Sequence, residues 1–310
     1  MVCIKDQEVN HKEEWDINSY MKKILFRVDS SSSIGHGHIM RSLVLAKQFK
    51  NSIVYFATLN LDGNINYKIE NAGYKIIPLK NNSLKELILI IDNYNINQII
   101  FDNYDIDYKF EKKVKTTTNI KVMVLDDFYQ KHYCDILLNH NISAKKSRYK
   151  GLVPKNTKLL CGKKYTLIRD EFKNIQPKKK NYPPKNILIA MGGSDILNLT
   201  PKIIKVLQNN FDFKIDVITT DANKNLNLLK NIDNINLHVN TTKMALLINN
   251  ADLAIISPSV ILHEVIYLKT PFIAIKTANN QIENIKYLKR KNFNILNKFN
   301  KNRFISYFII

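Results

Sequence analysis

Short apolar segments alternate with amphipathic stretches along most of the chain. In the first half, the apolar segments predict strands, and the stretches between them repeat apolar side chains at helical spacing. This alternation is typical of a largely parallel sheet with helices packed on its faces. The expected strands are residues 23–29, 52–58, 74–79, 97–103, 121–127 and 134–140.

Two helices are clearest in this half. Residues 38–50 place an apolar side chain at every third or fourth position, which predicts a buried stripe along one helix face. Residues 83–94 begin with Ser83 and Glu86, the pair of a capping box that starts a helix. Both helices are therefore expected to cover the first sheet.

A second series of the same kind begins at Asn186. A helix is expected to follow its first strand and to end at Asn209, and residues 304–310 predict either a strand or a packing tail. The expected strands are residues 186–193, 213–220, 235–240, 253–259 and 271–277, and the later helices are residues 244–249, 260–269 and 281–291.

These patterns predict an α/β protein with two doubly wound, Rossmann-like domains. We expect the domains at residues 21–158 and 186–292, joined by a Lys- and Pro-rich linker at 159–185. Residues 1–20 are expected to be an accessory tail, and residues 293–310 a C-terminal tail. In such folds a ligand binds beyond the carboxyl ends of the strands, here in a cleft between the domains.

The composition limits the possible partners. The net charge is +20, but only six of the 47 basic residues are Arg, and the lysines are interspersed with many asparagines. This pattern indicates a general compositional bias with solvated lysines more than a selected nucleic-acid surface. We therefore expect no nucleic-acid partner.

No apolar run is long enough to span a membrane, so we expect neither a membrane partner nor a membrane-bound location. Cys3, Cys134 and Cys161 are far apart and odd in number, which favours neither a disulfide framework nor a zinc site. Such cysteine usage fits a reducing compartment, and we expect a cytoplasmic monomer.

Two of the predicted strand-to-helix loops carry closely spaced glycines. Gly35 and Gly37 lie in the first half, and Gly192 and Gly193 in the second. Glycines in such loops let the backbone approach phosphate oxygens, although a tight turn alone also requires them. One such loop in each domain favours a ligand shared by both.

Two histidines, His36 and His38, flank Gly37. No third ligand lies at a recognisable spacing, so we expect no metal and no cofactor. His38 is predicted to lie in the first helical turn, where the helix dipole favours a neutral imidazole that can accept a proton from water. His36 is expected to point elsewhere.

Several ordered motifs together resemble a known family, the UDP-2,4-diacetamido-2,4,6-trideoxy-β-L-altropyranose hydrolases of pseudaminic acid synthesis. The resemblance extends from about Lys22 to about Asn292. Its motifs are SSSSIGHGHIMRSLVLA (30–46), LDDF (125–128), CDILLNHN (134–141), GLVP (151–154), CGKKYTLIRDEF (161–172), MGGSD (191–195) and ANNQ (278–281).

This resemblance implies a GT-B-like fold, with nucleotide bound by the second domain. It implies that water attacks a UDP-sugar and that UDP and a free 6-deoxy sugar are released, with His38 as general base. It also implies that Gly192 and Gly193 lie beside the phosphates, with Ser194 and Asn198 at the start of the next helix.

Further binding residues follow from the same resemblance. Glu264, after the turn that ends at Ser259, is expected to accept the ribose hydroxyls, although it is also compatible with a solvent-facing helix position. Asn280 and Gln281 are expected to contact the sugar or the phosphates. Asp102 and Tyr104 either line the sugar pocket or form a strand-end turn.

The charged residues near the first loop allow more than one interpretation. Arg27 and Arg41 either contact substrate or pair with Asp29 or Asp126, and Asp126 and Asp127 are either structural or sugar-binding. Three alternative functions also stay open: a glycosyltransferase with a UDP-sugar donor, a hydrolysing UDP-N-acetylglucosamine epimerase, and a basic nucleic-acid-binding module.

Overall fold

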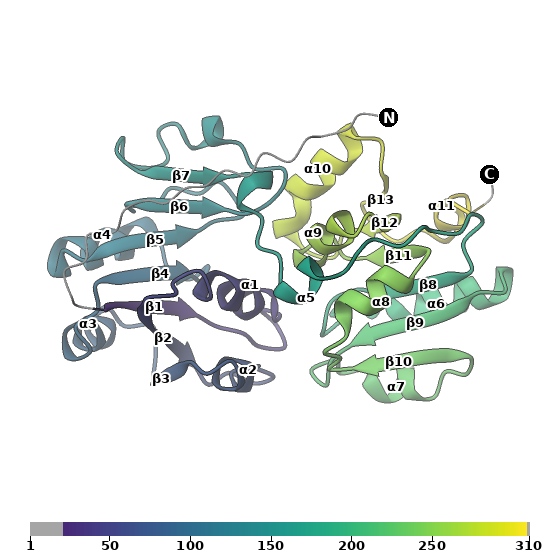
Figure 1. The fold of residues 1–310 in the computed structure, drawn as a ribbon, viewed down its shortest axis with the longest axis horizontal. Coiled ribbons are helices and arrows are strands. Elements are labelled where there is room, and N and C mark those ends of the chain that lie inside the picture. Colours follow the sequence, from purple (N-terminus) through teal and green to yellow (C-terminus); the bar gives the residue numbers. More distant parts are fainter. Residues whose placement is uncertain (1–20, 309–310) are drawn as a thin grey trace.

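Two parallel sheets, each with helices on its faces, make up the protein (Figure 1). A computed structural model describes residues 21–308, so the expected accessory tail at residues 1–20 lies outside the described residues. In the part of the chain described, no helix is both long enough and apolar enough to cross a membrane.

The first sheet has the order β3-β2-β1-β4-β5-β6-β7 within residues 21–308, and every pairing is parallel. Its apolar strands are buried because helices cover both faces. The strands are β1 (Lys22–Val28), β2 (Ser52–Leu59), β3 (Lys75–Leu79), β4 (Gln98–Asp102), β5 (Lys121–Leu125), β6 (Ile136–Asn139) and β7 (Lys158–Cys161).

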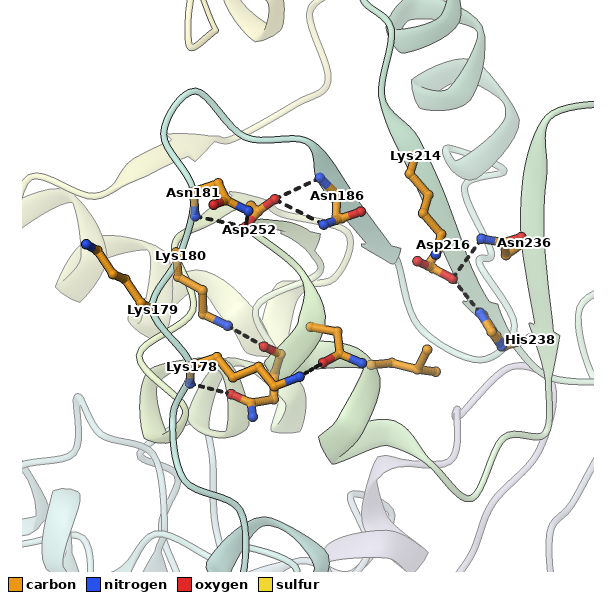
Figure 2. A pocket seen from close by; sticks show the side chains of 13 residues that line it. Lys178, Lys179, Lys180, Asn181, Asn186, Lys214, Asp216, Asn236, His238 and Asp252 are labelled. Carbon is orange, nitrogen blue, oxygen red and sulfur yellow. Dashed lines mark hydrogen bonds and ion pairs between the residues drawn. The ribbon is translucent and has the colours of Figure 1, made fainter.

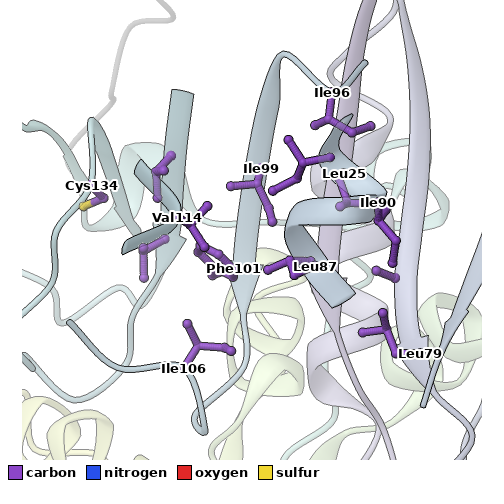
Figure 3. Packing of buried hydrophobic residues seen from close by; sticks show 14 of the residues in the cluster. Leu25, Leu79, Leu87, Ile90, Ile96, Ile99, Phe101, Ile106, Val114 and Cys134 are labelled. Atoms are coloured by element: carbon purple, nitrogen blue, oxygen red, sulfur yellow. The ribbon is translucent and has the colours of Figure 1, made fainter. Parts of the chain in front are cut away.

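The helices of this half pack on the sheet through their apolar stripes. Figure 3 shows one of the two cores, in which Leu87 and Ile90 lie close to Leu25, Ile99 and Phe101 of the strands. The helical elements are α1 (Gly37–Ala46), α2 (Tyr67–Asn71), α3 (Leu84–Asn93), α4 (Tyr108–Thr118), η1 (Lys146–Tyr149) and η2 (Lys163–Tyr165). The short helix α5 (Asp170–Lys173) follows in the connecting segment.

The second sheet has the order β10-β9-β8-β11-β12-β13 and is also parallel throughout residues 21–308. Its strands are β8 (Asn186–Ala190), β9 (Lys214–Thr219), β10 (Ile235–Val239), β11 (Leu253–Ile256), β12 (Phe272–Ile275) and β13 (Asn294–Leu296). Its helices are α6 (Thr200–Asn210), α7 (Leu226–Lys230), α8 (Met244–Asn250), α9 (Val260–Tyr267), η3 (Asn279–Gln281), α10 (Ile282–Arg290) and α11 (Lys301–Ile305).

Two segments differ from the sequence-based expectation. β7 extends the first sheet to Cys161, three residues beyond the expected end of the first domain. Residues 293–308 include β13, paired with β12, and α11, so this segment joins the second sheet and its core. Phe304, expected in either a strand or a tail, lies in α11 and is fully buried.

The connecting segment is anchored in both halves. Leu167 packs in the core beneath α1, whereas Phe172 is fully buried in the second core. Farther along, the Asp252 carboxylate accepts hydrogen bonds from the backbone N–H groups of Asn181, Lys185 and Asn186. The crossing between the two cores is therefore confined to the few residues between Leu167 and Phe172.

If the C-terminal segment is part of the second core, Phe304→Ala will destabilise the protein by about 3–5 kcal/mol, the usual cost of emptying a buried aromatic site. Urea unfolding measures the loss. Phe293→Ala is the matched control, because Phe293 is 40% exposed and only stacks on Phe272, so it should cost about 1 kcal/mol. Equal losses for the two variants would contradict the assignment.

Candidate active site

A cleft of about 320 Å³ lies where the carboxyl ends of the two sheets face each other. In Figure 1 the arrowheads of β5–β7 and of β9–β10 point toward each other across the molecule. Both glycine loops line this cleft, β1–α1 from one side and β8–α6 from the other. Open α/β sheets bind ligands at this edge, so we take the cleft as the candidate active site.

The β1–α1 loop is a tight turn that ends in a helix start. The Gly35 backbone N–H donates to the Ser31 carbonyl oxygen at 2.9 Å, and Gly35 has φ +84°, which a residue with a side chain rarely adopts. His36 follows as the N-cap of α1, and His38 lies in the first turn. The loop therefore delivers both histidines to the cleft.

The two histidines have different surroundings. His36 Nε2 lies 3.1 Å from the Gly63 carbonyl oxygen, so it carries the proton and donates to that oxygen. Burial lowers the pKa of His36. His38 Nδ1 lies 2.6 Å from Asp102 Oδ1, whereas its Nε2 has no hydrogen-bond partner among residues 21–308. Within the described residues, each histidine thus has one ring nitrogen without a hydrogen bond. They differ in the other nitrogen, which contacts a carboxylate in His38 and a backbone carbonyl in His36.

The Asp102 carboxylate determines the His38 tautomer. Asp102 is fully buried behind the cleft and accepts from Arg41 Nε at 2.8 Å and from Ser42 Oγ at 3.0 Å. Arg41 Nη2 lies 3.1 Å from the same His38 Nδ1, but the carboxylate is closer at 2.6 Å and only accepts, so we assign a proton to His38 Nδ1. A neutral His38 then has an unprotonated Nε2, which can accept a proton from water.

Arg41 lies between two buried carboxylates. Its Nη2 donates to Asp102 Oδ1 and its Nη1 to Asp127 Oδ2, both at 2.5 Å. Burial alone would raise the pKa values of both carboxyls, but the Arg41 charge keeps them well below their usual range. The same two charges outweigh burial and raise the pKa of Arg41. We call Asp102, Arg41 and Asp127 the Arg41 network.

Tyr104 connects this network to the other half of the molecule. Its hydroxyl donates to Asp127 Oδ2 at 2.8 Å and accepts from Asn280 Nδ2 at 3.3 Å. Its ring also packs edge-on against His38, with centroids 4.5 Å apart. Burial, followed by the Asp127 charge, raises the Tyr104 pKa, so the hydroxyl stays protonated as a donor.

A second pair of histidines lies deeper in the seam between the halves. His140 follows β6 and His263 lies on α9, and their buried rings are 5.1 Å apart. His140 Nε2 accepts from Arg41 Nη1 at 3.3 Å. Burial and the nearby Arg41 charge lower the pKa of His140 to about 4, and burial and His140 lower that of His263 to about 3.

The β8–α6 loop meets the β1–α1 loop directly. Gly192 has φ +100°, and a Cβ on Gly193 would lie 3.0 Å from His36 Nδ1 and 2.9 Å from Thr220 Cγ2. Glycine is therefore required at both positions, for different reasons. Ser194 also lines the cleft, whereas Asn198 has φ +48° and lies outside it.

Glu264 and Gln281 line the cleft, and each is held in place by hydrogen bonds to neighbouring residues. The Glu264 carboxylate accepts from Arg169 Nε at 2.6 Å and from Arg169 Nη2 at 2.9 Å. Burial raises the pKa of Glu264. Gln281 Oε1 accepts from the Thr277 backbone N–H at 2.8 Å, and its Nε2 donates to Ser257 Oγ at 2.8 Å. Gln281 thus holds together two loops of the second sheet beside Ser259.

The structure brings most of the expected residues together. Asp102 lies behind the cleft and Asn198 outside it, and Arg41 pairs with Asp102 and Asp127 instead of Asp29 or Asp126. The remaining expected residues line the cleft: Gly35, Gly37, His38, Arg41, Tyr104, Gly192, Gly193, Ser194, Ser259, Glu264, Asn280 and Gln281.

Several other cleft residues were not singled out from the sequence, among them His140, Asn141, Arg169 and Asn284. The first three lie within motifs that carry the family resemblance, NHN and LIRDEF. Their place in these motifs is the sequence feature that could have identified them as site residues. Asn284 stands outside the quoted motifs. Among residues 21–308, no three His, Cys, Asp or Glu side chains form a group that would hold a metal ion.

A larger hollow of about 670 Å³ lies at the opposite, amino-terminal edge of the second sheet (Figure 2). Its polar groups bond to one another: His238 Nε2 lies 2.7 Å from Asp216 Oδ1, and Lys180 Nζ donates to the Asn249 carbonyl oxygen at 2.8 Å. Strand ends of this kind do not gather catalytic loops. The carboxyl-edge cleft is therefore the better candidate.

Comparison with known proteins identifies a relative that covers nearly the whole chain. The chain is 39% identical over 282 residues to the UDP-2,4-diacetamido-2,4,6-trideoxy-beta-L-altropyranose hydrolase of Campylobacter jejuni, covering 89% of this chain and 100% of that protein. No family model matches.

Solved structures show the same fold at low sequence identity. MurG of Acinetobacter baumannii aligns with a TM-score of 0.62 and 12% identity, covering 93% of this chain and 91% of that one. The spinosyn rhamnosyltransferase SpnG aligns with a TM-score of 0.64 and 10% identity, covering 93% and 92%. The expected GT-B-like fold is thus confirmed.

The buried histidines predict acid sensitivity. His140 and His263 stay neutral in the folded protein down to about pH 4 and 3, whereas histidines of the unfolded chain bind protons near pH 6.5. Between these values the unfolded state holds more protons, so the free energy of unfolding falls as the pH falls, by up to about 1.4 kcal/mol per pH unit for each histidine.

Urea unfolding of the wild type and His263→Leu between pH 7 and 4 tests this prediction. We expect a shallower pH dependence in the variant, because it lacks one histidine that must be kept uncharged. Equal slopes would show that His263 is not held neutral.

Proposed function

The chain belongs to the UDP-2,4-diacetamido-2,4,6-trideoxy-β-L-altropyranose hydrolase family and is an enzyme, and from this premise we propose that it hydrolyses that nucleotide-sugar to UDP and the free 2,4-diacetamido-2,4,6-trideoxy sugar, a step of pseudaminic acid synthesis. The observation that carries the proposal is the His38–Asp102 pair, whose free Nε2 lies at a cleft between two phosphate-type glycine loops.

His38 acts as general base in this reaction. Its Nε2 takes a proton from a water molecule while the water oxygen bonds to the anomeric carbon. The bond from that carbon to the phosphate oxygen breaks, and its electron pair leaves with UDP. Asp102 stabilises the imidazolium that forms, because its carboxylate already accepts from Nδ1 at 2.6 Å. Direct attack by water inverts the anomeric centre.

The leaving UDP is held by the second domain. Gly192, Gly193 and Ser194 line the cleft opposite His38, and backbone N–H groups of such a loop stabilise charge that develops on a pyrophosphate. The close approach of Gly193 to His36 leaves no space for a side chain there.

Glu264 accepts the ribose hydroxyls. Arg169 occupies one lone pair on each Glu264 oxygen and holds the carboxylate in a fixed plane. The remaining lone pairs are free for a pair of neighbouring hydroxyl donors. Tyr104 and Asn280, joined across the cleft at 3.3 Å, lie on the His38 side and contact the sugar.

The choice between His38 and His36 provides the first test. His38→Asn should lower the rate of UDP release from the altropyranose substrate by about 10²–10⁴-fold, the usual contribution of a general base. His36→Asn is the matched control and should stay within a few-fold of wild type, because the ring of His36 bonds to the Gly63 carbonyl oxygen and not to a carboxylate that would stabilise an imidazolium.

The assay contains no sugar acceptor, and it measures UDP together with the free sugar. Activity of His38→Asn close to wild type would contradict the mechanism, and loss in His36→Asn alone would move the base to His36. UDP release that requires an added acceptor would indicate a glycosyltransferase, and turnover of UDP-N-acetylglucosamine instead would indicate the epimerase.

A second test addresses the tautomer. Asp102→Asn keeps the shape of the side chain but presents an amide to His38 Nδ1, which permits the tautomer whose Nε2 is protonated. We expect kcat to fall by about 10²-fold or more. Ser42→Ala removes a neutral 3.0 Å donor to the same carboxylate and should change kcat only slightly. Similar effects of the two changes would contradict a special role for Asp102.

A further inference from the structure

Asn284, on α10 of the second domain, uses its whole amide group at the seam between the two halves. Its Nδ2 donates to Asn141 Oδ1 at 3.2 Å and to the Pro258 carbonyl oxygen at 3.1 Å. Its Oδ1 accepts from Ser143 Oγ at 3.1 Å. Asn284 is 3% exposed, so these bonds replace contacts with water. The orientation of the amide is therefore determined by its partners.

Asn141 passes this contact to the Arg41 network. Its Nδ2 donates to Asp127 Oδ1 at 2.8 Å, while its Oδ1 faces Asn284. The Asn141 amide is thus a single bridge between α10 and a buried carboxylate of the first domain. If Asn284 moves away, Asn141 loses the partner that orients it.

Asp127 transmits the contact to the catalytic pair. Its Oδ2 accepts a hydrogen bond from Arg41 Nη1. The other edge of the Arg41 guanidinium donates to Asp102, which in turn accepts from His38 Nδ1. The guanidinium is planar and rigid, so a shift of Asp127 at one edge turns the edge that faces Asp102. Every link in this path is a hydrogen bond between buried side chains.

A second contact from the same part of the second domain ends on the same carboxylate. Asn280 Nδ2 donates to the Tyr104 hydroxyl, which donates to Asp127 Oδ2. Asn284 lies at the start of α10, and Asn280 lies four residues earlier, in the short η3 turn that precedes this helix. Both oxygens of Asp127 therefore connect to this one helix start.

We propose that Asn284 is a positioning residue that makes the alignment of His38 depend on closure of the two domains. This inference rests on the proposed function, since it concerns the hydrolytic reaction of the same site. When the domains close, the Asn284–Asn141–Asp127 contacts fix Arg41 and Asp102, and His38 presents an unprotonated Nε2 to water. When the domains open, the contacts break and the base is less well oriented, which limits activation of water in an open cleft.

The neighbouring residue provides a matched control. Glu283 also crosses the seam, through an ion pair with Arg148 at its more exposed edge, but neither residue contacts the Arg41 network. Glu283→Gln therefore weakens adhesion between the domains without touching the path to His38. Ser143→Ala removes one bond to Asn284 and leaves the Asn141 and Asp127 contacts in place.

The test compares kcat and KM for hydrolysis of the altropyranose substrate in Asn284→Ala, Asn284→Asp, Ser143→Ala and Glu283→Gln. We expect kcat to fall about 10-fold in Asn284→Ala and further in Asn284→Asp, because its carboxylate faces two acceptors, Asn141 Oδ1 and the Pro258 carbonyl. KM and the affinity for UDP should change less than threefold. Ser143→Ala and Glu283→Gln should stay within threefold of wild type.

A measurement without substrate separates positioning from substrate contact. In ¹⁵N NMR spectra of the free enzyme, the His38 ring should show the Nδ1-protonated tautomer in wild type and in Glu283→Gln, and a mixture of tautomers in Asn284→Ala. An unchanged His38 spectrum in Asn284→Ala, or a rise in KM with unchanged kcat, would overturn the proposal.

The two proposals fail in different ways. If wild type does not hydrolyse the substrate, the proposed function fails. If wild type is active and Asn284→Ala behaves like Glu283→Gln, only the coupling fails. If kcat falls to the same degree in Asn284→Ala and Glu283→Gln, the loss comes from weaker contact between the domains in general, and the coupling is also overturned.

Discussion

The constraint on which this site depends is the burial of Arg41 between two carboxylates. A guanidinium out of water is tolerated only when its donors are paired, and here the paired acceptors are Asp102 and Asp127. With His38 neutral, the three charged groups leave one net negative charge beneath the cleft. In the proposed mechanism that charge favours the imidazolium formed when His38 takes a proton from water, and the same arginine holds both carboxylates ionised.

Because of this constraint, the two domains contribute different kinds of groups to the site. The charged groups lie on α1, at the end of β4 and after β5, so the ionised side chains that surround His38 all belong to the first domain. The second domain contributes the glycine loop, Glu264 and the amides at the start of α10, which are neutral apart from the Glu264–Arg169 pair. In the proposed reaction, electrostatic stabilisation and substrate positioning therefore come from different domains, and both are available only where the two halves meet.

Much of the fold could be predicted because its strands are buried on both faces and form continuous apolar runs. β7 was missed because Lys158–Cys161 is short and half-buried at the sheet edge, and β13 because Asn294–Leu296 has only three residues. His38 could be singled out because its loop and helix are local in sequence. The partners that give it chemistry are not: Asp102 is 64 residues away, and Asn284 is 143 residues from Asn141. No local pattern specifies such pairs, and the choice of Asp127 over Asp126 as the partner of Arg41 depends on which side of one strand end faces the cleft.

The short crossing between Leu167 and Phe172 acts as a tether. Each of these side chains is buried in a different core, and five fully extended residues span at most about 18 Å. The halves therefore cannot drift apart after UDP leaves, and their local concentration relative to each other stays high. Contact between the halves is therefore an intramolecular event, and Arg169, which holds Glu264, lies within the tether. The residue that orients the carboxylate proposed to accept the ribose hydroxyls is thus also part of the segment that joins the two domains, so a change at Arg169 would affect both the proposed nucleotide site and the connection between the halves.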